Sequence, residues 1–356
     1  MAVPVTERRM PSVGGDIDAE FARIVDELTR RGLFTGGLGA AALLGLGACG
    51  QDRSAPAGSG PSAGSRSVRH KYGTTDVPAD PKRVVALGYT DLEPLLGLGV
   101  PPVGIVEFFG SGLDGAWAWE KPLWQGKTPQ IVGERDTYNF EKVAALGPDL
   151  IIGMYSGMTK ADYAKLSALA PTVAQPVGYP DFAAPWTVIT RLAGQAVGRQ
   201  EQAEKLITGV RSAFAGARKA HPEWAGKTVA VAEPFKADQW AVFGARDPKV
   251  QFVEELGFAI APAVKSFNPG GDVKNLSVER LDLLDVDQLI LLIDTGDRTA
   301  PQVKDDPLFG KLRVSRGRTA FLPFSADPPV GAALSYNSAI SIPFGIEHVV
   351  AALADR

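Results

Sequence analysis

Short apolar runs alternate with segments of helical spacing through the middle of the chain. One apolar run covers 84–88 (VVALG) and another covers 151–155 (IIGMY). Runs of this length are typical of buried strands, whereas 91–97 and 163–170 space their apolar residues as helices do. A further apolar segment lies at 100–106. This alternation predicts a parallel sheet with helices on both faces.

Between residues 186 and 219 the apolar positions keep helical spacing without an interrupting proline. This pattern predicts one helix of about 30 residues, roughly 45 Å long. The alternation then starts again, with strands expected at 228–232 and 289–294 and helices at 250–257 and 343–353.

The pattern therefore predicts an α/β protein of two Rossmann-like lobes joined by one long backbone helix. The expected bounds are 68–185 for the first lobe, 186–220 for the linking helix and 221–356 for the second lobe. A chain of 356 residues is long enough for two domains. Because such folds bind ligands at the carboxyl ends of their strands, the ligand cleft is expected between the lobes.

The two halves share a repeated unit. The segment NFEKVAALGPDLII at 139 aligns with SVERLDLLDVDQLI at 277, an offset of 138 residues, and predicts one helix–strand unit per lobe. Glu141 and Glu279 occupy the same place in the two copies. An acid in the first helical turn after Asn139 or Ser277 stabilises the helix dipole by about 0.3–1 kcal/mol, which explains both glutamates without any partner.

The N-terminal segment resembles an export signal. Arg30 and Arg31 precede an apolar run of about fifteen residues that ends at Cys49. This order is typical of a twin-arginine signal with a lipobox over 1–49, and the run is too short to span a bilayer, which takes about 20 residues. A Gly/Ser/Pro-rich tether is expected over 50–67. The alternative is a hydrophobic helix in which Cys49 is a small apolar filler.

Composition excludes several functions. The net charge of −3 gives no electrostatic footprint for nucleic acid, and a single cysteine leaves no internal disulfide. His70, His221 and His348 lack metal-ligand spacing. Patterns resembling a dinucleotide fingerprint and a nucleophile elbow fall in the signal and the tether, and the Gly-Lys-Thr triplets at 126 and 226 lack the upstream glycine of a P-loop.

Aromatic and cationic residues after the predicted strands are the candidate ligand contacts. Aromatic faces give contact area at low entropic cost, and arginines suit anionic oxygens, so this set fits a bulky chelate. Alternatively, Trp117, Trp119 and Trp124 pack on their own lobe. The predicted ligand-binding residues are Tyr89, Trp119, Trp124, Tyr155, Trp240, Arg246, Arg298 and Tyr336, with Phe243 and Phe324 nearby.

Several segments together resemble one family. They include VPADPKRVVALGYTDLEPLLGLGVPPVGI, NFEKVAALGPDLIIG, PLFGKLRVSRGRTAFLPF and ALSYNSAISIPFGIEHVVAAL. In order and spacing the chain is similar, from about Tyr72 to its end, to the iron-siderophore and vitamin B12 substrate-binding proteins of ABC importers. The resemblance implies two α/β lobes on one backbone helix that move little on binding.

The resemblance also implies a function. It predicts a lipid-anchored receptor, held by Cys49 to the outer face of the cytoplasmic membrane, that passes a ferric siderophore to an ABC permease. Glu141 and Glu279 match the surface glutamates by which family members contact arginines of the permease. No enzyme activity, cofactor, directly bound metal or nucleic-acid partner is expected, and the protein is expected to be a monomer.

Other ligands and functions remain open at this point. Haem, cobalamin or another metal chelate could replace the ferric siderophore, and the residues do not separate a catecholate from a hydroxamate ligand. An exported α/β enzyme and a surface interaction protein that lost transport are the alternatives from other classes.

Overall fold

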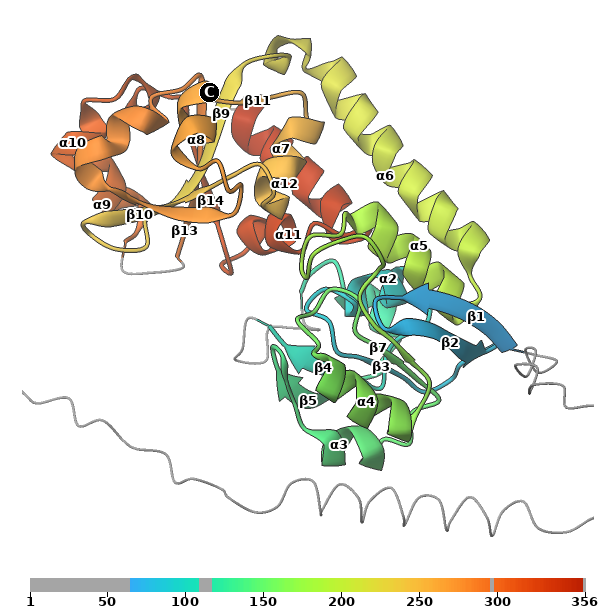
Figure 1. Ribbon diagram of the computed structural model, residues 1–356. Coiled ribbons are helices and arrows are strands. Elements are labelled where there is room, and N and C mark those ends of the chain that lie inside the picture. Colours follow the sequence, from blue (N-terminus) through green and yellow to red (C-terminus); the bar gives the residue numbers. More distant parts are fainter. Residues whose placement is uncertain (1–64, 109–116, 295–297, 355–356) are drawn as a thin grey trace, which may run out of the picture.

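The computed structural model describes residues 65–108, 117–294 and 298–354 and has two α/β lobes (Figure 1). In the first lobe a six-stranded sheet has the order β6-β5-β4-β3-β7-β8, and every neighbouring pair is parallel except β5 with β6. Its strands are β3 (Val84–Ala86), β4 (Gly104–Glu107), β5 (Gln130–Glu134), β6 (Thr137–Tyr138), β7 (Leu150–Ile152) and β8 (Thr172–Val173).

Helices of the first lobe follow its strands in sequence. They are α2 (Leu92–Gly97), the 3₁₀ helix η1 (Lys121–Trp124), α3 (Phe140–Ala145) and α4 (Lys160–Leu169). An antiparallel hairpin of β1 (Ser65–His70) and β2 (Gly73–Pro78) precedes the sheet. Because Ser65–Ser67 pair with Asp76–Pro78, the hairpin includes the last residues of the expected tether, and the predicted lobe boundary at 68 is three residues late.

The second lobe is built on another six-stranded sheet with the order β12-β10-β9-β13-β14, in which β11 also pairs with β9. β10 is antiparallel to both neighbours, and the other pairs are parallel. Its strands are β9 (Thr228–Glu233), β10 (Gln239–Phe243), β11 (Ala259–Ile260), β12 (Val273–Ser277), β13 (Gln288–Ile293) and β14 (Thr319–Pro323).

Helices and 3₁₀ helices surround this second sheet (Figure 1). The α-helices are α7 (Pro248–Glu255), α8 (Pro262–Phe267), α9 (Ala300–Lys304), α10 (Pro307–Gly310), α11 (Val330–Tyr336) and α12 (Ser341–Ala354). The 3₁₀ helices are η2 (Pro222–Trp224), η3 (Val278–Leu284) and η4 (Arg313–Ser315). Among the described residues, no helix combines the length and the apolar character needed to cross a membrane.

The repeat is one structural unit used once per lobe, as predicted. In the first copy Asn139 caps α3, and the chain continues into β7; in the second copy Ser277 caps η3, and the chain continues into β13. β7 lies between β3 and β8, and β13 lies between β9 and β14, so both strands take the same place relative to their neighbours.

The prediction of one helix over 186–220 is wrong. The segment forms two helices, α5 (Trp186–Val197) and α6 (Gln200–Ala220), separated at Gly198, whose φ of 71° is left-handed. Arg66 of β1 stabilises the break because its Nε donates to the carbonyl of Gln195 at 3.0 Å and its Nη2 donates to that of Ala196 at 3.1 Å. These are carbonyls that the end of α5 would leave without partners.

Only α6 therefore runs from one lobe to the other (Figure 1). With 21 residues it is about 30 Å long. α5 instead belongs to the first lobe, whose core it enters through Ile189, Leu192 and Ala193. α6 packs against α5 and also against α12 of the second lobe.

The two lobes share a buried seam. Ala332, Ala333 and Tyr336 of α11 pack in the core of the first lobe, although the chain has reached them through the second lobe. Phe344 of α12 contacts Trp119 of the first lobe, with ring centroids 5.0 Å apart. The lobes are therefore joined by packed side chains as well as by α6.

Candidate functional site

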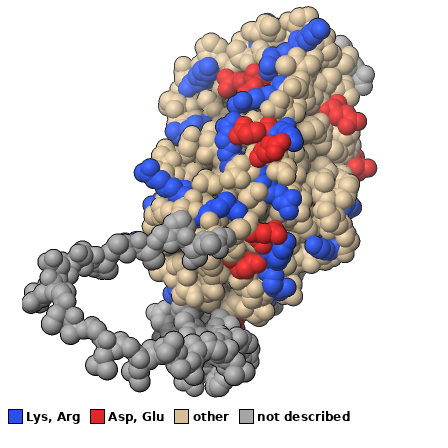
Figure 2. All heavy atoms as spheres, turned by 90° about the vertical axis from the view of Figure 1, so that its right-hand side faces the viewer, with Lys and Arg blue, Asp and Glu red and all other residues tan. Residues whose placement is uncertain are grey.

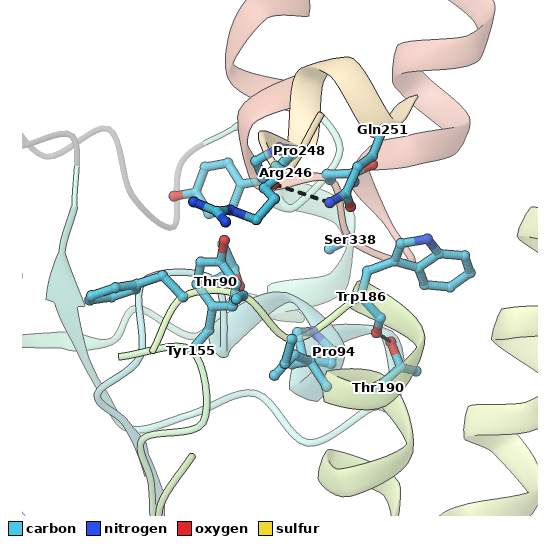
Figure 3. A pocket seen from close by; sticks show the side chains of 15 residues that line it. Thr90, Pro94, Tyr155, Trp186, Thr190, Arg246, Pro248, Gln251 and Ser338 are labelled. Atoms are coloured by element: carbon cyan, nitrogen blue, oxygen red, sulfur yellow. Dashed lines mark hydrogen bonds between the residues drawn. The ribbon is translucent and has the colours of Figure 1, made fainter. Parts of the chain in front are cut away.

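A pocket lies between the two lobes, and both lobes line it. The first lobe, together with the start of α5, lines one side of the pocket, and the start of α7 lines it from the second lobe (Figure 3). The lining residues are Thr90, Pro94, Tyr155, Phe182, Ala183, Ala184, Trp186, Ile189, Thr190, Arg246, Pro248, Gln251, Tyr336, Asn337 and Ser338.

Asp91 holds the first-lobe wall in place. This buried carboxylate accepts hydrogen bonds from the backbone N–H of Met154 at 2.6 Å and of Tyr155 at 3.1 Å. Burial raises the pKa of Asp91 to about 6, although these backbone donors act in the opposite direction. A Cβ at position 88 would lie 2.2 Å from Asp91 Oδ2, so Gly88 leaves the room that this contact requires.

Tyr155 presents a neutral phenol to the pocket. Its hydroxyl points toward Arg246 of the opposite lobe (Figure 3). Burial, together with the negative charge of nearby Asp247, raises the pKa of Tyr155 to about 12. The ring can therefore contact a ligand by its face and donate a hydrogen bond from its hydroxyl at neutral pH.

An aromatic cluster continues from Tyr155 toward the edge of the first lobe. Phe182 packs edge-on to Tyr155, with ring centroids 5.8 Å apart, and against Tyr89 at 4.8 Å. Tyr89 also stacks on Phe108 at 4.4 Å. The Tyr89 hydroxyl donates to Asp136 at 2.6 Å, and burial followed by this hydrogen bond raises the pKa of Tyr89.

The back of the pocket connects the lobes. Trp186 at the start of α5 packs against the core of the second lobe, and the Thr190 hydroxyl donates to the Trp186 carbonyl at 2.7 Å. Tyr336 packs edge-on to Trp117 and Trp119, with centroid distances of 6.3 and 6.2 Å. Ser338, two residues later, donates a hydrogen bond to the buried carboxyl of Glu93.

Arg246 provides the charged group of the second-lobe wall. Its guanidinium forms two hydrogen bonds with Asp272, from Nε at 3.2 Å and from Nη2 at 2.7 Å. Its backbone N–H donates to the carbonyl of Gly271 at 2.7 Å, and its carbonyl accepts from Gln251 Nε2 at 3.0 Å (Figure 3). Both side chains of this ion pair are largely exposed, Arg246 at 58% and Asp272 at 72%, so the guanidinium is at the mouth of the pocket, where a ligand can reach it.

Three of the predicted ligand contacts come together in the pocket: Tyr155, Arg246 and Tyr336. Tyr89 lies in the adjoining aromatic cluster, where it contacts Phe182 of the lining. The structure brings in several residues that were not predicted, among them Phe182, Trp186, Gln251, Asn337 and Ser338. Of these, Phe182 and Trp186 are aromatic residues near the expected lobe boundary at 185. This position is the one feature of the sequence that could have indicated a place in a pocket between the lobes.

The other four predicted contacts lie elsewhere. Trp119 and Trp124 are 9% and 4% exposed in the core of the first lobe, as the alternative of packing on their own lobe predicted. Trp240 is 0% exposed and packs near Phe309 in the second lobe. These large apolar side chains stabilise the lobes by burial. Arg298 does not line the pocket, and its Nη1 is 2.9 Å from Asp306 Oδ2 in a largely buried ion pair.

The remaining predicted positions are at the surface or outside the described residues. Glu141 and Glu279 are exposed in the first turns of α3 and η3. Cys49, the predicted lipid-anchor residue, lies outside the described residues, as do the signal over 1–49 and the tether up to residue 64. Within the described ranges, no group of three or more His, Cys, Asp or Glu side chains could hold a metal ion.

One broad face of the molecule carries no single sign of charge. On the side where α6 and the β1–β2 hairpin lie, Figure 2 shows basic and acidic side chains interspersed. Arg191 of α5 and Glu204 of α6 form an ion pair, with Nε and Oε1 2.6 Å apart. An extended basic surface of the kind that binds nucleic acid is not found on this face.

The fold and the site together define a class, that of two-lobed α/β binding proteins that hold a small molecule between their lobes. The chain belongs to the periplasmic binding protein family, whose sequence model matches residues 84–317. Members of this family bind solutes, so the protein is a binding protein and not an enzyme. The expected resemblance and the two-lobed fold are confirmed.

Two proteins of Bacillus subtilis are similar to this chain in sequence. YfiY of Bacillus subtilis, named as a probable siderophore-binding lipoprotein, is 29% identical over 224 residues, which are 61% of this chain and 64% of YfiY. The match thus spans less than two thirds of that relative. The Fe(3+)-citrate-binding protein YfmC of the same organism is 25% identical over 268 residues, 72% of this chain and 77% of YfmC.

Two solved structures are similar to this chain over nearly the whole length of the solved protein. A periplasmic solute binding protein from Mycobacterium smegmatis superposes with a TM-score of 0.70 and 28% identity, over 82% of this chain and 98% of its own. Streptococcus pneumoniae PiaA in complex with ferrichrome superposes with a TM-score of 0.67 and 25% identity, over 81% of this chain and 97% of its own.

Proposed function

We propose that this protein captures a ferric siderophore outside the cytoplasm and delivers it to the permease of an ABC importer. The observation that carries the proposal is the pocket between the lobes, in which Tyr155, Tyr336 and Arg246 converge on one space. Two aromatic rings and one guanidinium suit a bulky chelate that displays oxygen atoms. The names of YfiY and YfmC, and the ferrichrome complex of PiaA, support an iron chelate as the ligand.

We further propose that the protein is a monomeric lipoprotein on the outer face of the cytoplasmic membrane, anchored through Cys49. The apolar run that ends at Cys49 and the polar stretch after it support this location. Glu141 and Glu279 are proposed to contact the permease, one from each lobe. Their exposure and their matching positions in the repeat support this role.

Ligand binding by the purified chain tests the proposed function. The full chain in a mild detergent is titrated with ferrichrome, ferric enterobactin, ferric citrate, haemin, cobalamin and uncomplexed Fe³⁺, and tryptophan fluorescence is followed. Trp186 lines the pocket, so a bound iron chelate should quench its emission, and Trp186→Phe identifies this part of the signal. Sub-micromolar binding of a ferric chelate with no response to Fe³⁺ alone is expected. Binding of haemin or cobalamin in its place, or silence across the panel, would refute the proposal.

A further inference from the structure

The pocket is almost free of charge. Among its 15 lining residues, Arg246 is the only one that is ionised at neutral pH, because the others are apolar side chains, hydroxyls or amides. Tyr155 belongs to the neutral group since its pKa is raised to about 12. Hydroxyl and amide groups can donate hydrogen bonds to a chelate without adding charge.

The charge of Arg246 is already balanced within its own lobe. Asp272 takes two hydrogen bonds from the guanidinium, and this contact lowers the pKa of Asp272, so the carboxylate stays ionised. Gly271 keeps the pair close, because a Cβ there would come within 3.0 Å of Arg246 Cγ. The Arg246–Asp272 pair thus presents donors to the pocket with no net charge.

The charged side chains next to Arg246 on the second-lobe wall also form a neutral ion pair. Asp247 is near enough to Tyr155 to raise the pKa of its phenol, and it pairs with Lys249 at 2.9 Å in a largely buried contact. The internal segments outside the described residues, 109–116 and 295–297, contain Asp114 and Asp297 but no lysine or arginine.

We infer that the ligand is a ferric chelate of little or no net charge, of the tris-hydroxamate class, an inference that rests on the proposed function. Three hydroxamates neutralise Fe³⁺, whereas three catecholates leave the complex trianionic. A trianion entering the pocket would meet one cation among the lining residues, Arg246, which already pairs with Asp272, so most of its charge would lose hydration without gaining a partner. A neutral chelate loses little hydration and can accept hydrogen bonds from the hydroxyls and from Arg246.

Competition between two iron complexes tests the inference. The full chain is titrated with ferrichrome, a neutral tris-hydroxamate, and with ferric enterobactin, a trianionic tris-catecholate, at low and high ionic strength. We expect ferrichrome to bind at least about tenfold more tightly, with an affinity that salt leaves unchanged because no net charge is paired. Equal or tighter binding of the trianion would overturn the inference while leaving the proposed function standing. If ferrichrome, ferric enterobactin and ferric citrate all fail to bind, the result would overturn this inference and the proposed function together.

A charge variant tests the same point within the pocket. Asp272→Asn removes the acid that balances Arg246, and we expect it to improve binding of the trianionic chelate by about tenfold relative to ferrichrome. The matched control is Glu204→Gln, which makes the same change in net charge at the Arg191–Glu204 pair between α5 and α6. If the ratio of the two affinities is the same in Asp272→Asn as in Glu204→Gln, the charge balance at Arg246 does not determine the ligand class.

Discussion

Ser338 in the pocket wall donates a hydrogen bond to Glu93 of α2, across 245 positions of sequence. The other oxygen of the same carboxyl accepts from Trp119 Nε1 at 2.7 Å. Glu93 is 0% exposed, and Glu120, also 0% exposed, lies within hydrogen-bonding reach of it. The buried seam between the lobes and the wall of the ligand pocket therefore meet at one carboxyl group.

This carboxyl should make stability depend on pH. Burial raises the pKa of Glu93 to about 7 from an ordinary value of 4.5, although hydrogen bonds from Ser338 and Trp119 act in the opposite direction. The folded protein therefore keeps a proton that the unfolded chain releases. The resulting stabilisation is full below pH 4.5 and is lost as the pH rises through 7, by on the order of a few kcal/mol.

Glu93→Gln should remove this part of the pH dependence. Urea unfolding of the wild type and the variant at pH 5 and pH 8 measures this dependence. Between pH 5 and pH 8 the free energy of unfolding of the wild type should fall by more than that of the variant. Asp91, also buried with a raised pKa, titrates equally in both proteins and cancels in the comparison. Parallel pH profiles would contradict the assignment of the titration to Glu93.

The break between α5 and α6 should tolerate only glycine at position 198. Gly198→Ala places a side chain at a φ of 71° and within 2.7 Å of Arg66 Nη1, so we expect a loss of about 1–3 kcal/mol in the free energy of unfolding. The control is Gly209→Ala in the middle of α6, where a Cβ meets no atom within 4 Å. Helix propensity should make that variant more stable by about 0.5–1 kcal/mol. Thermal unfolding compares the two, and equal effects would rule out the strained break.

Removing the Tyr155 ring should weaken ligand binding far more than it weakens the fold. Tyr155→Ala is expected to lower the affinity for ferrichrome by about 10- to 100-fold, because a buried aromatic contact is lost. Tyr179→Ala, at a 38% exposed tyrosine outside the pocket, is the control and should bind as the wild type does. Fluorescence titration measures both variants. An unchanged affinity for Tyr155→Ala would remove this residue from the site.

Charge reversal at the two repeated glutamates should separate binding from transport. The double variant Glu141→Arg/Glu279→Arg is expected to keep its ligand affinity, because both residues are exposed and outside the pocket, and to lose iron uptake in cells. Glu201→Arg on α6, which reverses another exposed acid, one that pairs with Lys205, is a control and should leave uptake intact. Weakened ligand binding by the double variant, or normal uptake, would argue against a role in permease contact.

The lipid anchor has its own test. Cys49→Ala should move the protein from the membrane fraction to the soluble fraction, because a lipoprotein signal attaches its lipid through this thiol. Incorporation of labelled fatty acid, present in the wild type and absent in the variant, is the direct measurement. Continued membrane association of the variant would mean that another segment holds the protein there.

Local patterns predicted the architecture well. Apolar runs such as 84–88 and the cap residues Asn139 and Ser277 determine their elements through neighbours along the chain, and the structure has strands and helices at these places. The repeat was visible for the same reason. The break at Gly198 has a local signal, a glycine that can take the left-handed conformation in which helices end, but the apolar spacing continues through it and hides the break; the group that stabilises it, Arg66, comes from 130 positions away.

The site was harder to predict because the lining of a pocket depends on which side of each element faces the other lobe. Trp240 and Tyr155 both belong to strand regions of similar composition, yet Trp240 turns into its own core while Tyr155 turns into the pocket. Ser338 and Asn337 are small polar residues without a motif. Only the packing of α11 against the first lobe brings them to the site.

The helix α6 and the Glu93–Ser338 contact act together on the dimensions of the molecule. A helix of 21 residues resists shortening, and the buried hydrogen bond at the seam opposes sliding of one lobe past the other. Both features therefore oppose a change in the distance between a side chain on one lobe and a side chain on the other. A partner that contacts both lobes at once therefore depends on the spacing between its two contact points as well as on the side chains at each of them.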